Sequence, residues 1–452
     1  MSDLTLTELL EKYDVPVPRY TSYPAVPNWQ QTPPLDMWFA ALNHALSSDA
    51  ATLAVYVHLP FCETLCTFCG CNTVITRNHG RSAPYVNTVL AELDVYVRHV
   101  EALQRREISQ LHLGGGTPTF MAPDVLAALL RGIAARLPLH AAGFEGSVEV
   151  DPRVTTRAHL DVLREHGISR VSLGVQDFDT EVLRLVNRPQ PQSITAALCA
   201  QAREAGYDSI NFDLIYGLPA QSAATMRQLA EAVVALAPDR LAVYSFARVP
   251  WIKPAQRKFK DEDVPVGAAK RELYEILRER LLAAGYLEIG LDHFALPHDA
   301  LATAAAAGTL HRNFMGYTDR RTTALLGLGV SAISETPACY HQNEKVITVY
   351  ERRVAAGEVP TLRGHILSDD DRHRADLIRS LMTSGRAPLT PADRDAARAE
   401  LADLVRDGLV EIDEGELRVP ARGRPFIRNI AAFFDTYLRS AAKEGPVYSR
   451  AI

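Results

Sequence analysis

The sequence has no long apolar run, no basic leader and no excess of positive charge. No stretch of about 18 uncharged apolar residues, the length that spans a bilayer, occurs anywhere in it. Met1–Thr5 is not a basic segment leading into an apolar one, so we expect no secretory or transit signal and a cytoplasmic location. The net charge of -6 provides no overall attraction to nucleic acid or acidic membranes. Any anionic partner must therefore be bound by local arginines.

Cysteine is scarce, with 6 in 452 residues, but four of the six lie within ten positions. Because thiols stay reduced in the cytoplasm, this clustering favours metal binding or redox chemistry over a disulfide framework. The chain exceeds the roughly 250–300 residues at which one hydrophobic core stops growing. With 47% apolar residues, it is expected to form one large domain with smaller additions.

Strand-like and helix-like segments alternate about six times from residue 53 onward. This alternation is typical of parallel βα units, and six such units form a partial version of the eight-unit barrel. Strands are expected at Leu53–Leu59, Gln110–Leu113, Ser147–Asp151, Arg170–Val175, Ser209–Ile215 and Arg240–Phe246. Helices are expected at Tyr85–Leu103, Pro123–Leu137, Arg157–His166, Ser193–Ala205 and Ala223–Leu236. The sequence therefore predicts an α/β fold with a partial (β/α)6 barrel.

The segments on either side of this barrel have different patterns. A short helix is expected at Leu4–Lys12. Residues 16–24 should follow it as an extended segment, because residues that precede proline avoid the helical conformation. Beyond the barrel, Lys270–Ala284 is expected to be helical, and 290–294 and 311–317 to be loops. Helices and a small hairpin wing follow, with too many acidic residues to favour nucleic-acid binding. The expected divisions are an N-terminal arm (1–50), the partial barrel (51–260), a barrel extension and substrate-covering region (261–365) and a mainly helical C-terminal domain (366–452).

Every predicted strand ends in polar or glycine-rich residues. The chemistry of such barrels gathers at the C-terminal ends of the strands, so we expect one polar site there. Side chains alternate along a strand, so Tyr56 and His58 should share one face. The signals are Tyr56, His58 and the cysteines after the first strand, then Gly114–Thr119, Glu149–Arg153, Gln176 with Asp177, Asp213 with Tyr216–Pro219, and Ala247 with Arg248.

Cys62, Cys66 and Cys69 have a C-x3-C-x2-C spacing, and Cys71 follows two residues later. Zinc is an alternative, although no second ligand pair follows at the spacing of a zinc ribbon. Three closely spaced thiolates suit three irons of a [4Fe–4S] cluster, which leaves one iron open to a small-molecule ligand. An open iron favours a catalytic cluster over one that only transfers electrons.

Taken together, these motifs resemble the oxygen-independent coproporphyrinogen III oxidase family of the radical S-adenosylmethionine (SAM) superfamily. The resemblance covers nearly the whole chain. It is carried by Pro18–Pro24, Tyr56–Cys62, Cys69–Cys71, Gly114–Thr119, Glu149–Arg153, Gly174–Phe178, Asp213–Pro219, Leu310–Phe314, Gly329–Ser334 and Asn429–Arg439. Two features depart from the family pattern: Met315 stands where relatives often have glutamine, and 381–386 is shorter and less typical.

The resemblance implies a set of cofactor ligands. Cys62, Cys66 and Cys69 would bind one [4Fe–4S] cluster, with Cys71 as a nearby non-ligand, and two SAM molecules would lie side by side. The implied SAM contacts are Tyr56, Phe68, Gly115, Gly116, Thr117, Glu149, Gln176, Arg188, Asp213, Ala247 and Ile333. Tyr56, His58 and Glu149 are the implied catalytic residues. The alternatives are a core histidine at His58 and purely structural carboxylates at Glu149 and Asp213, while Cys199 and Cys339 are expected to be buried thiols.

The implied activity is oxidative decarboxylation of two propionates of coproporphyrinogen III to vinyl groups, giving protoporphyrinogen IX for haem synthesis without oxygen. A reductant such as flavodoxin or ferredoxin and an electron acceptor are the implied partners, and a monomer is expected. A substrate with four carboxylates needs cations, for which Arg19, Arg248 and Arg312 are candidates. The alternatives are a haem chaperone, whose family usually lacks the arm and the Cys71 equivalent, and a radical SAM methyltransferase or ring-opening enzyme acting on tetrapyrroles.

Overall fold

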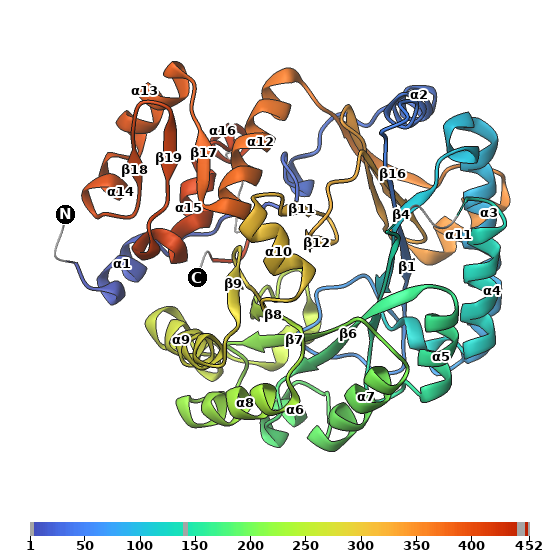
Figure 1. Cartoon of the computed structure of the whole chain (residues 1–452), viewed down its shortest axis with the longest axis horizontal. Helices are drawn as coiled ribbons and strands as arrows, with labels where there is room; N and C mark the ends of the chain where they lie inside the picture. The colour runs from blue at the N-terminus through green and yellow to red at the C-terminus, as the bar shows by residue number, and fades with distance from the viewer. Residues whose placement is uncertain (1–3, 139–142, 441–447, 451–452) are drawn as a thin grey trace. The chain divides into compact units, whose positions relative to one another are not determined.

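All six strands expected from the alternation are present in the computed structural model, which describes residues 4–138, 143–440 and 448–450 (Figure 1). Met1–Asp3, part of the segment used to judge an N-terminal leader, lie outside the described residues. The strands are β1 (Leu53–Leu59), β4 (Ile108–Gly115), β5 (Glu145–Val150), β6 (Ile168–Gln176), β7 (Ser209–Tyr216) and β8 (Arg240–Ser245). The predicted α/β class is confirmed.

The chain divides into two compact units. Unit 1 consists of Met1–Asn28, Leu214–Arg321 and Asp369–Ile452. Unit 2 consists of Trp29–Asp213 and Thr322–Ser368. The boundary between them falls within β7. Each unit is therefore built from segments that are distant in the sequence.

The sheet of unit 2 is centred on β1, whose apolar side chains are buried because both faces of a parallel strand are covered. β1 pairs in parallel with β4 on one side and with β13 (Ala324–Leu328) on the other. The strand order is β16-β15-β14-β13-β1-β4-β5-β6. The antiparallel extension comprises β14 (Ile333–Glu335), β15 (Cys339–Asn343) and β16 (Thr361–Ile366), and a separate pair comprises β2 (Phe61–Cys62) and β3 (Val74–Ile75).

Amphipathic helices cover this sheet in succession, and Figure 1 shows α3, α4 and α5 along its outer side. In α4, for example, Leu126, Leu130 and Ile133 are buried at the spacing of one helix face, and Pro123 occupies the first turn, where no amide hydrogen bond is lost. The helices of unit 2 are α2 (Leu35–Ala45), α3 (Ser82–His99), α4 (Pro123–Ala134), α5 (Arg157–Glu165), α6 (Thr180–Leu185), α7 (Gln192–Glu204) and α11 (Ile347–Ala355).

Unit 1 contains β8 and two short strands in the order β8-β10-β9, together with two smaller sheets. Residues 311–317, expected to be a loop, instead contain an antiparallel hairpin of β11 (His311–Asn313) and β12 (Gly316–Thr318), so that expectation was wrong. β9 spans Leu287–Ile289 and β10 spans His293–Ala295, so the expectation of a loop at 290–294 was wrong for its last two residues. The predicted wing is a three-stranded sheet of β17 (Arg386–Pro388), β19 (Glu416–Arg418) and β18 (Glu411–Ile412).

The helices of unit 1 include α1 in the N-terminal arm, whose Thr5 and Glu8 form a capping box. Leu9 and Leu10 of this helix pack into the same core as Leu377 and Phe426 from the C-terminal segment. The helices are α1 (Leu6–Tyr13), α8 (Ala223–Leu236), α9 (Gly267–Ala283), α10 (Ala300–Ala307), α12 (Asp369–Ser384), α13 (Pro391–Glu400), α14 (Ala402–Arg406), α15 (Ile427–Ala432) and α16 (Thr436–Ser440).

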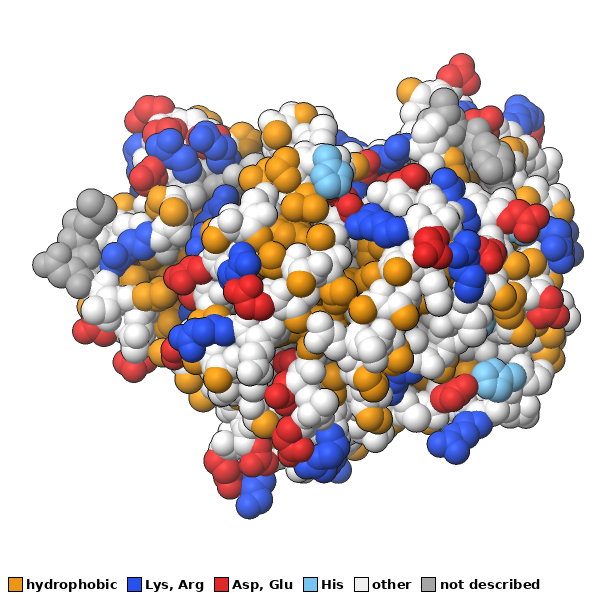
Figure 2. All heavy atoms as spheres, turned by 60° about the horizontal axis from the view of Figure 1, so that its bottom comes forward, with side chains coloured by type: hydrophobic (Ala, Val, Ile, Leu, Met, Phe, Trp, Pro, Cys, Tyr) orange, Lys and Arg blue, Asp and Glu red, His pale blue; other side chains and the backbone are white. Residues whose placement is uncertain are grey.

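Basic and acidic side chains are interspersed on the face shown in Figure 2. Many charged residues form exposed ion pairs, such as Arg157 with Asp161 and Arg280 with Glu231. Such pairs contribute only about 0–1 kcal/mol each, so the buried core dominates stability. Over the residues that the structure describes, no helix has the length and apolar character needed to cross a membrane.

Candidate active site

The four clustered cysteines lie in and after β2, directly beyond the end of β1. Cys66 is buried, Cys62 and Cys69 are partly exposed, and Cys71 is exposed. The amide of Cys69 donates to the carbonyl of Cys66 over 3.1 Å, which closes a tight turn between these two residues. Burial raises the pKa of the Cys62 thiol to about 11, although Thr117 Oγ1, 3.3 Å from Cys62 Sγ, opposes that shift.

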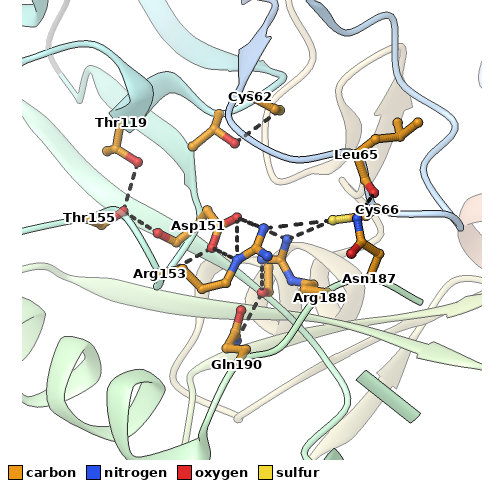
Figure 3. A network of polar contacts seen from close by, with 12 residues as sticks. Cys62, Leu65, Cys66, Thr119, Asp151, Arg153, Thr155, Asn187, Arg188 and Gln190 are labelled. Carbon is orange, nitrogen blue, oxygen red and sulfur yellow. Dashed lines mark hydrogen bonds and ion pairs between the residues drawn. The ribbon is translucent and has the colours of Figure 1, made fainter. Parts of the chain in front are cut away.

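Two arginines approach the sulfur of Cys66 (Figure 3). Arg188 Nη1 lies 3.5 Å from Cys66 Sγ, and Arg153 Nη2 lies 3.9 Å from it. Asp151 Oδ2 accepts hydrogen bonds from Arg188 Nη1 over 3.1 Å and from Arg153 Nη2 over 2.6 Å. Burial alone would raise the pKa of Asp151, but the two guanidinium groups outweigh burial and lower it. The positive charges favour an anionic group at Cys66, as expected beside thiolate-bound iron.

The same region of unit 2 anchors the cysteine loop to the segment after α6 (Figure 3). Asn187 Nδ2 donates to the carbonyl of Leu65 over 2.7 Å, and the amide of Thr67 donates to the carbonyl of Val186 over 3.0 Å. Arg188 Nη2 donates to the carbonyl of Gly174 over 2.6 Å, at the end of β6. The loop is therefore fixed on both sides of Cys66.

The glycine-rich segment after β4 packs directly against the strand that leads to Cys62. Gly115 has φ of +111°, and a Cβ atom there would lie 2.5 Å from the ring of His58. A Cβ atom on Gly116 would lie 2.6 Å from the carbonyl carbon of Pro60. The amides of Gly116 and Thr117 donate to the carbonyls of Leu59 and Phe61, each over 2.9 Å. Both glycines are thus required by close approach of the two segments.

Tyr56 and His58 share one face of β1, as the alternation predicts, and lie beside this turn. Tyr56 Oη lies 3.0 Å from His58 Nδ1, and His58 Nε2 donates to the carbonyl of Asn72 over 2.8 Å. Because that carbonyl only accepts, the proton of a neutral imidazole is on Nε2, and Nδ1 accepts from Tyr56. Burial lowers the pKa of His58 and raises that of Tyr56 well above its usual value. The two side chains therefore form a neutral hydrogen-bonded pair.

Glu149 lies at the end of β5, with 42% of its side chain exposed. Its Oε2 accepts from the amide of Gly115 over 3.0 Å, and its Oε1 lies 3.4 Å from His112 Nε2. Burial opposes ionisation, but His112 and the Gly115 amide outweigh it and lower the pKa of Glu149. His112 in turn lies 2.7 Å from Ser147 Oγ through Nδ1. The result is an ionised, partly exposed carboxylate beside the glycine turn.

The remaining predicted contacts lie in or next to other strands, except Phe68, which lies in the cysteine loop. Gln176 ends β6 with a positive φ of 68° and is buried. Asp213 Oδ2 accepts from Ser172 Oγ over 2.9 Å, and its Oδ1 accepts from Asn211 over 3.0 Å. Phe68 and Ile333 are partly exposed in unit 2. Ala247 follows β8 in unit 1, where its carbonyl accepts from Gln256 Nε2 over 3.2 Å.

Several residues of this region were not named as site residues from the sequence. Asp151 and Arg153 belong to the Glu149–Arg153 motif at the end of a predicted strand, and this position could have identified them as site residues. His112 precedes Gly114 by two residues and therefore lies on the same face of β4. The alternation of side chains along a strand could have identified it as a site residue.

The donor set fits an iron–sulfur cluster. Among the described residues, no three His, Cys, Asp or Glu side chains converge as a single-ion site. Cluster thiolates instead bind different irons. The three thiols of the C-x3-C-x2-C segment are the donor type that such a cluster requires, and the two guanidinium groups at Cys66 carry the positive charge that suits a thiolate.

Comparisons with known proteins agree with this chemistry. The model of the radical SAM superfamily matches residues 56–233. The oxygen-independent coproporphyrinogen III oxidase of Escherichia coli is 42% identical over 446 residues, covering 96% of both chains. The protein of the same name from Pseudomonas aeruginosa is 39% identical over 450 residues, covering 97% of both chains. The solved structure of coproporphyrinogen III oxidase (HemN) from Escherichia coli, described as a radical SAM enzyme, matches with a TM-score of 0.86 at 41% identity, covering 93% of this chain and 97% of that chain.

Proposed function

The chain belongs to the family of oxygen-independent coproporphyrinogen III oxidases, which are radical SAM oxidoreductases, and from this premise we propose how its residues serve that reaction. The substrate is coproporphyrinogen III, and two of its propionate side chains become vinyl groups. Each conversion removes one hydrogen atom from the propionate β-carbon, one carbon dioxide and one electron. The observation that carries the proposal is near full-length identity of 42% to a relative of that name, together with the arginine-flanked cysteine loop.

Cys62, Cys66 and Cys69 are the proposed ligands of one [4Fe–4S] cluster, and Cys71 is a neighbouring non-ligand. When bound, the cluster and SAM supply a 5′-deoxyadenosyl radical that removes a hydrogen atom from the substrate. Arg153 and Arg188 stabilise the negative charge at Cys66, and Asp151 holds both guanidinium groups in position. Two bound SAM molecules remain part of the proposal.

The proposed SAM contacts are those that the family resemblance implies, and the geometry supports some of them. Glu149 has the exposed, ionised carboxylate needed to accept a hydrogen bond from a ribose hydroxyl or an ammonium group. Arg188 Nε is buried without a hydrogen-bond partner among the described residues, which supports a role toward an anionic group. The full proposed set is Tyr56, Phe68, Gly115, Gly116, Thr117, Glu149, Gln176, Arg188, Asp213, Ala247 and Ile333.

Tyr56, His58 and Glu149 are the proposed catalytic residues. Because Tyr56 and His58 are neutral near pH 7, they orient a reactant by hydrogen bonding and packing rather than by donating charge. This suits a step in which a hydrogen atom moves rather than a proton. Water exclusion by the buried part of the site protects such a step from side reactions.

The setting of the reaction is also proposed. A reductant such as flavodoxin or ferredoxin supplies one electron, and a separate acceptor receives the electron released on decarboxylation. We infer a monomer acting in the cytoplasm, with the arm (1–50), partial barrel (51–260), substrate-covering region (261–365) and C-terminal domain (366–452) as its functional parts.

Product analysis by mass tests the function. Anaerobically reconstituted protein is incubated with SAM, a reductant, an electron acceptor and coproporphyrinogen III. A divinyl product is expected, and the Cys62→Ala variant should form none. SAM cleavage without decarboxylation would contradict the proposal. A methylated tetrapyrrole would instead indicate a methyltransferase, and tight stoichiometric haem binding without turnover would indicate a chaperone.

A further inference from the structure

One face of α3 carries two polar side chains that are completely buried. Tyr85 and Glu92 are both 0% exposed, and together with the buried Val89 and Tyr96 they have the spacing of a single helix face. A glutamate is almost never fully buried unless its carboxylate has partners. Both residues have partners in the turn between β13 and β14, residues 329–332, which belongs to unit 2 like α3 itself.

Two successive backbone amides of this turn donate to α3. The amide of Gly329 donates to Glu92 Oε2 over 2.8 Å, and the amide of Val330 donates to Tyr85 Oη over 2.9 Å. Tyr85 Oη itself donates to the carbonyl of His58 over 2.8 Å. Burial raises the pKa of Tyr85 well above its usual value, so this hydroxyl keeps its proton. One hydroxyl group therefore connects the turn to the end of β1.

The turn also packs directly against β1. Gly329 has a φ of +93°, and a Cβ atom there would lie 2.6 Å from the carbonyl oxygen of His58 and 2.8 Å from Tyr85 Oη. Only glycine allows this approach at positive φ. The backbone of the turn, the end of β1 and the Tyr85 hydroxyl thus meet with no space for another atom between them.

Glu92 is fixed by further donors that belong to the same network. Asn343 Nδ2 donates to Glu92 Oε1 over 2.6 Å and to the carbonyl of Gly329 over 2.8 Å. Tyr350 Oη donates to Glu92 Oε2 over 2.7 Å. Asn343 and Tyr350 are both 0% exposed. The carboxylate therefore has a single position, from which it accepts the hydrogen bond of the Gly329 amide.

The turn leads directly into Ile333, which lies close to Tyr56. Tyr56 of β1 is the parallel partner of Gly327 in β13. Leu325 pairs with Glu335 in the antiparallel pair of β13 and β14, and the same register places Ile333 opposite Gly327. A Cβ atom on Gly327 would clash with the carbonyl oxygen of Ile333, which agrees with this placement. The position of Ile333 relative to Tyr56 thus depends on the turn that precedes it.

We propose that Tyr85 and Glu92 are positioning residues for SAM, because they hold the turn against the end of β1 and thereby place Ile333. This inference rests on the proposed function, under which Ile333 and Tyr56 contact SAM. Both side chains are completely buried, so they act through the turn and not by touching SAM. SAM affinity falls with the fraction of molecules in which the turn is in place, so loss of these hydrogen bonds weakens binding.

Tyr85→Phe tests the proposal, because it removes only the hydroxyl that accepts from Val330 and donates to His58. Anaerobic, cluster-loaded variant should bind SAM about tenfold more weakly than the parent in an equilibrium titration. In a SAM-cleavage assay the KM for SAM should rise, while kcat at saturating SAM stays within about threefold, because bound SAM restores the turn. Without SAM, the backbone amides of residues 325–335 should exchange hydrogen faster than in the parent.

Tyr96→Phe is the matched control. Tyr96 is also 0% exposed and lies on the same face of α3, but its hydroxyl accepts from Trp38 Nε1 of α2 over 3.3 Å. Both variants lose one buried hydroxyl, so both should have a lower melting temperature. Only Tyr85→Phe should change SAM affinity and hydrogen exchange at the turn. A purely structural role of Tyr85 would instead give the two variants the same results.

Two results would overturn the inference: SAM affinity within about threefold of the parent in Tyr85→Phe, or an equal loss of affinity in Tyr96→Phe. Should Tyr85→Phe fail to fold or to bind iron, Asn343→Ala, which removes the donor to Gly329 and Glu92, carries the test with the same limits. Tyr85-dependent SAM binding without any vinyl product would overturn only the proposed function. Vinyl production with a KM for SAM that is the same in Tyr85→Phe and parent would overturn only the positioning role.

Discussion

Replacing Glu92 by glutamine should alter how stability depends on pH. Glu92 in α3 is 0% exposed, and all three of its observed donors are neutral. Its Oε2 accepts from the amide of Gly329 over 2.8 Å and from Tyr350 Oη over 2.7 Å, and its Oε1 accepts from Asn343 Nδ2 over 2.6 Å. This network holds the turn between β13 and β14, which precedes the proposed SAM contact Ile333.

Burial raises the pKa of Glu92 from 4.5 to about 7, despite those three hydrogen bonds. The folded chain therefore binds this proton more tightly than the unfolded chain, and the Glu92 contribution to stability falls as the pH rises from about 4.5 through about 7. Between pH 5 and pH 8 the free energy of unfolding should decrease by about 2–3 kcal/mol from this group. Glutamine does not ionise, so the variant lacks this decrease.

At pH 5 the Glu92→Gln variant should be less stable than the parent by about 1–3 kcal/mol. The side-chain nitrogen of the new glutamine would face Asn343 Nδ2, and two donors cannot form a hydrogen bond with each other. That deficit should shrink by about 2–3 kcal/mol at pH 8. Anaerobic urea unfolding of parent and variant across this pH range measures the difference. Glu181→Gln, at an exposed residue whose pKa lies below the usual value because of Arg184, should give a flat difference. A flat difference for Glu92→Gln as well would show that the pKa of Glu92 is not raised in the folded chain.

Three further predictions concern the cysteine loop and the glycine turn. Gly115→Ala should lower SAM affinity and the melting temperature, because the added methyl group meets the His58 ring at positive φ; an unchanged melting temperature and affinity would contradict the turn geometry. Cys71→Ala should retain the iron content of the parent, whereas Cys66→Ala should lose most of it; equal loss in both would make Cys71 a ligand. Arg153→Gln should make the midpoint potential of the cluster more negative, because a positive charge near Cys66 disappears; an EPR-monitored redox titration that finds no change or a positive shift would contradict this.

The barrel strands were predictable from the sequence because their signals are local. The run LAVYVHL has Val and Leu on one face and Ala, Tyr and His on the other, and it stops before Pro60, so β1 was predicted with its observed bounds. β13 was missed, since five residues containing a glycine give a weak strand signal and its parallel pairing with β1 joins segments about 270 residues apart. The β11–β12 hairpin was missed for a related reason: its strands are short, and His311, Arg312 and Asn313 are polar.

For the site, too, local sequence signals were readable, whereas contacts between distant segments were not. The cysteine spacing is contiguous in the sequence, so the cluster hypothesis was available at once, although the assigned contacts stay predictions. The link from Arg188 to Cys66 joins residues 122 positions apart and depends on tertiary packing. Likewise, Arg19 was a candidate only by charge, and its approach to Asp292, 3.9 Å between Nη1 and Oδ2, required coordinates.

The central claim is that this chain removes a hydrogen atom from the β-carbon of a substrate propionate. The most direct measurement is anaerobic turnover of coproporphyrinogen III deuterated at the propionate β-carbons, followed by mass analysis of the 5′-deoxyadenosine and of the tetrapyrrole. Deuterium is expected in the 5′-deoxyadenosine, which should form together with a vinyl product. Deuterium-free 5′-deoxyadenosine alongside a decarboxylated tetrapyrrole, or SAM cleavage with the tetrapyrrole unchanged, would contradict it.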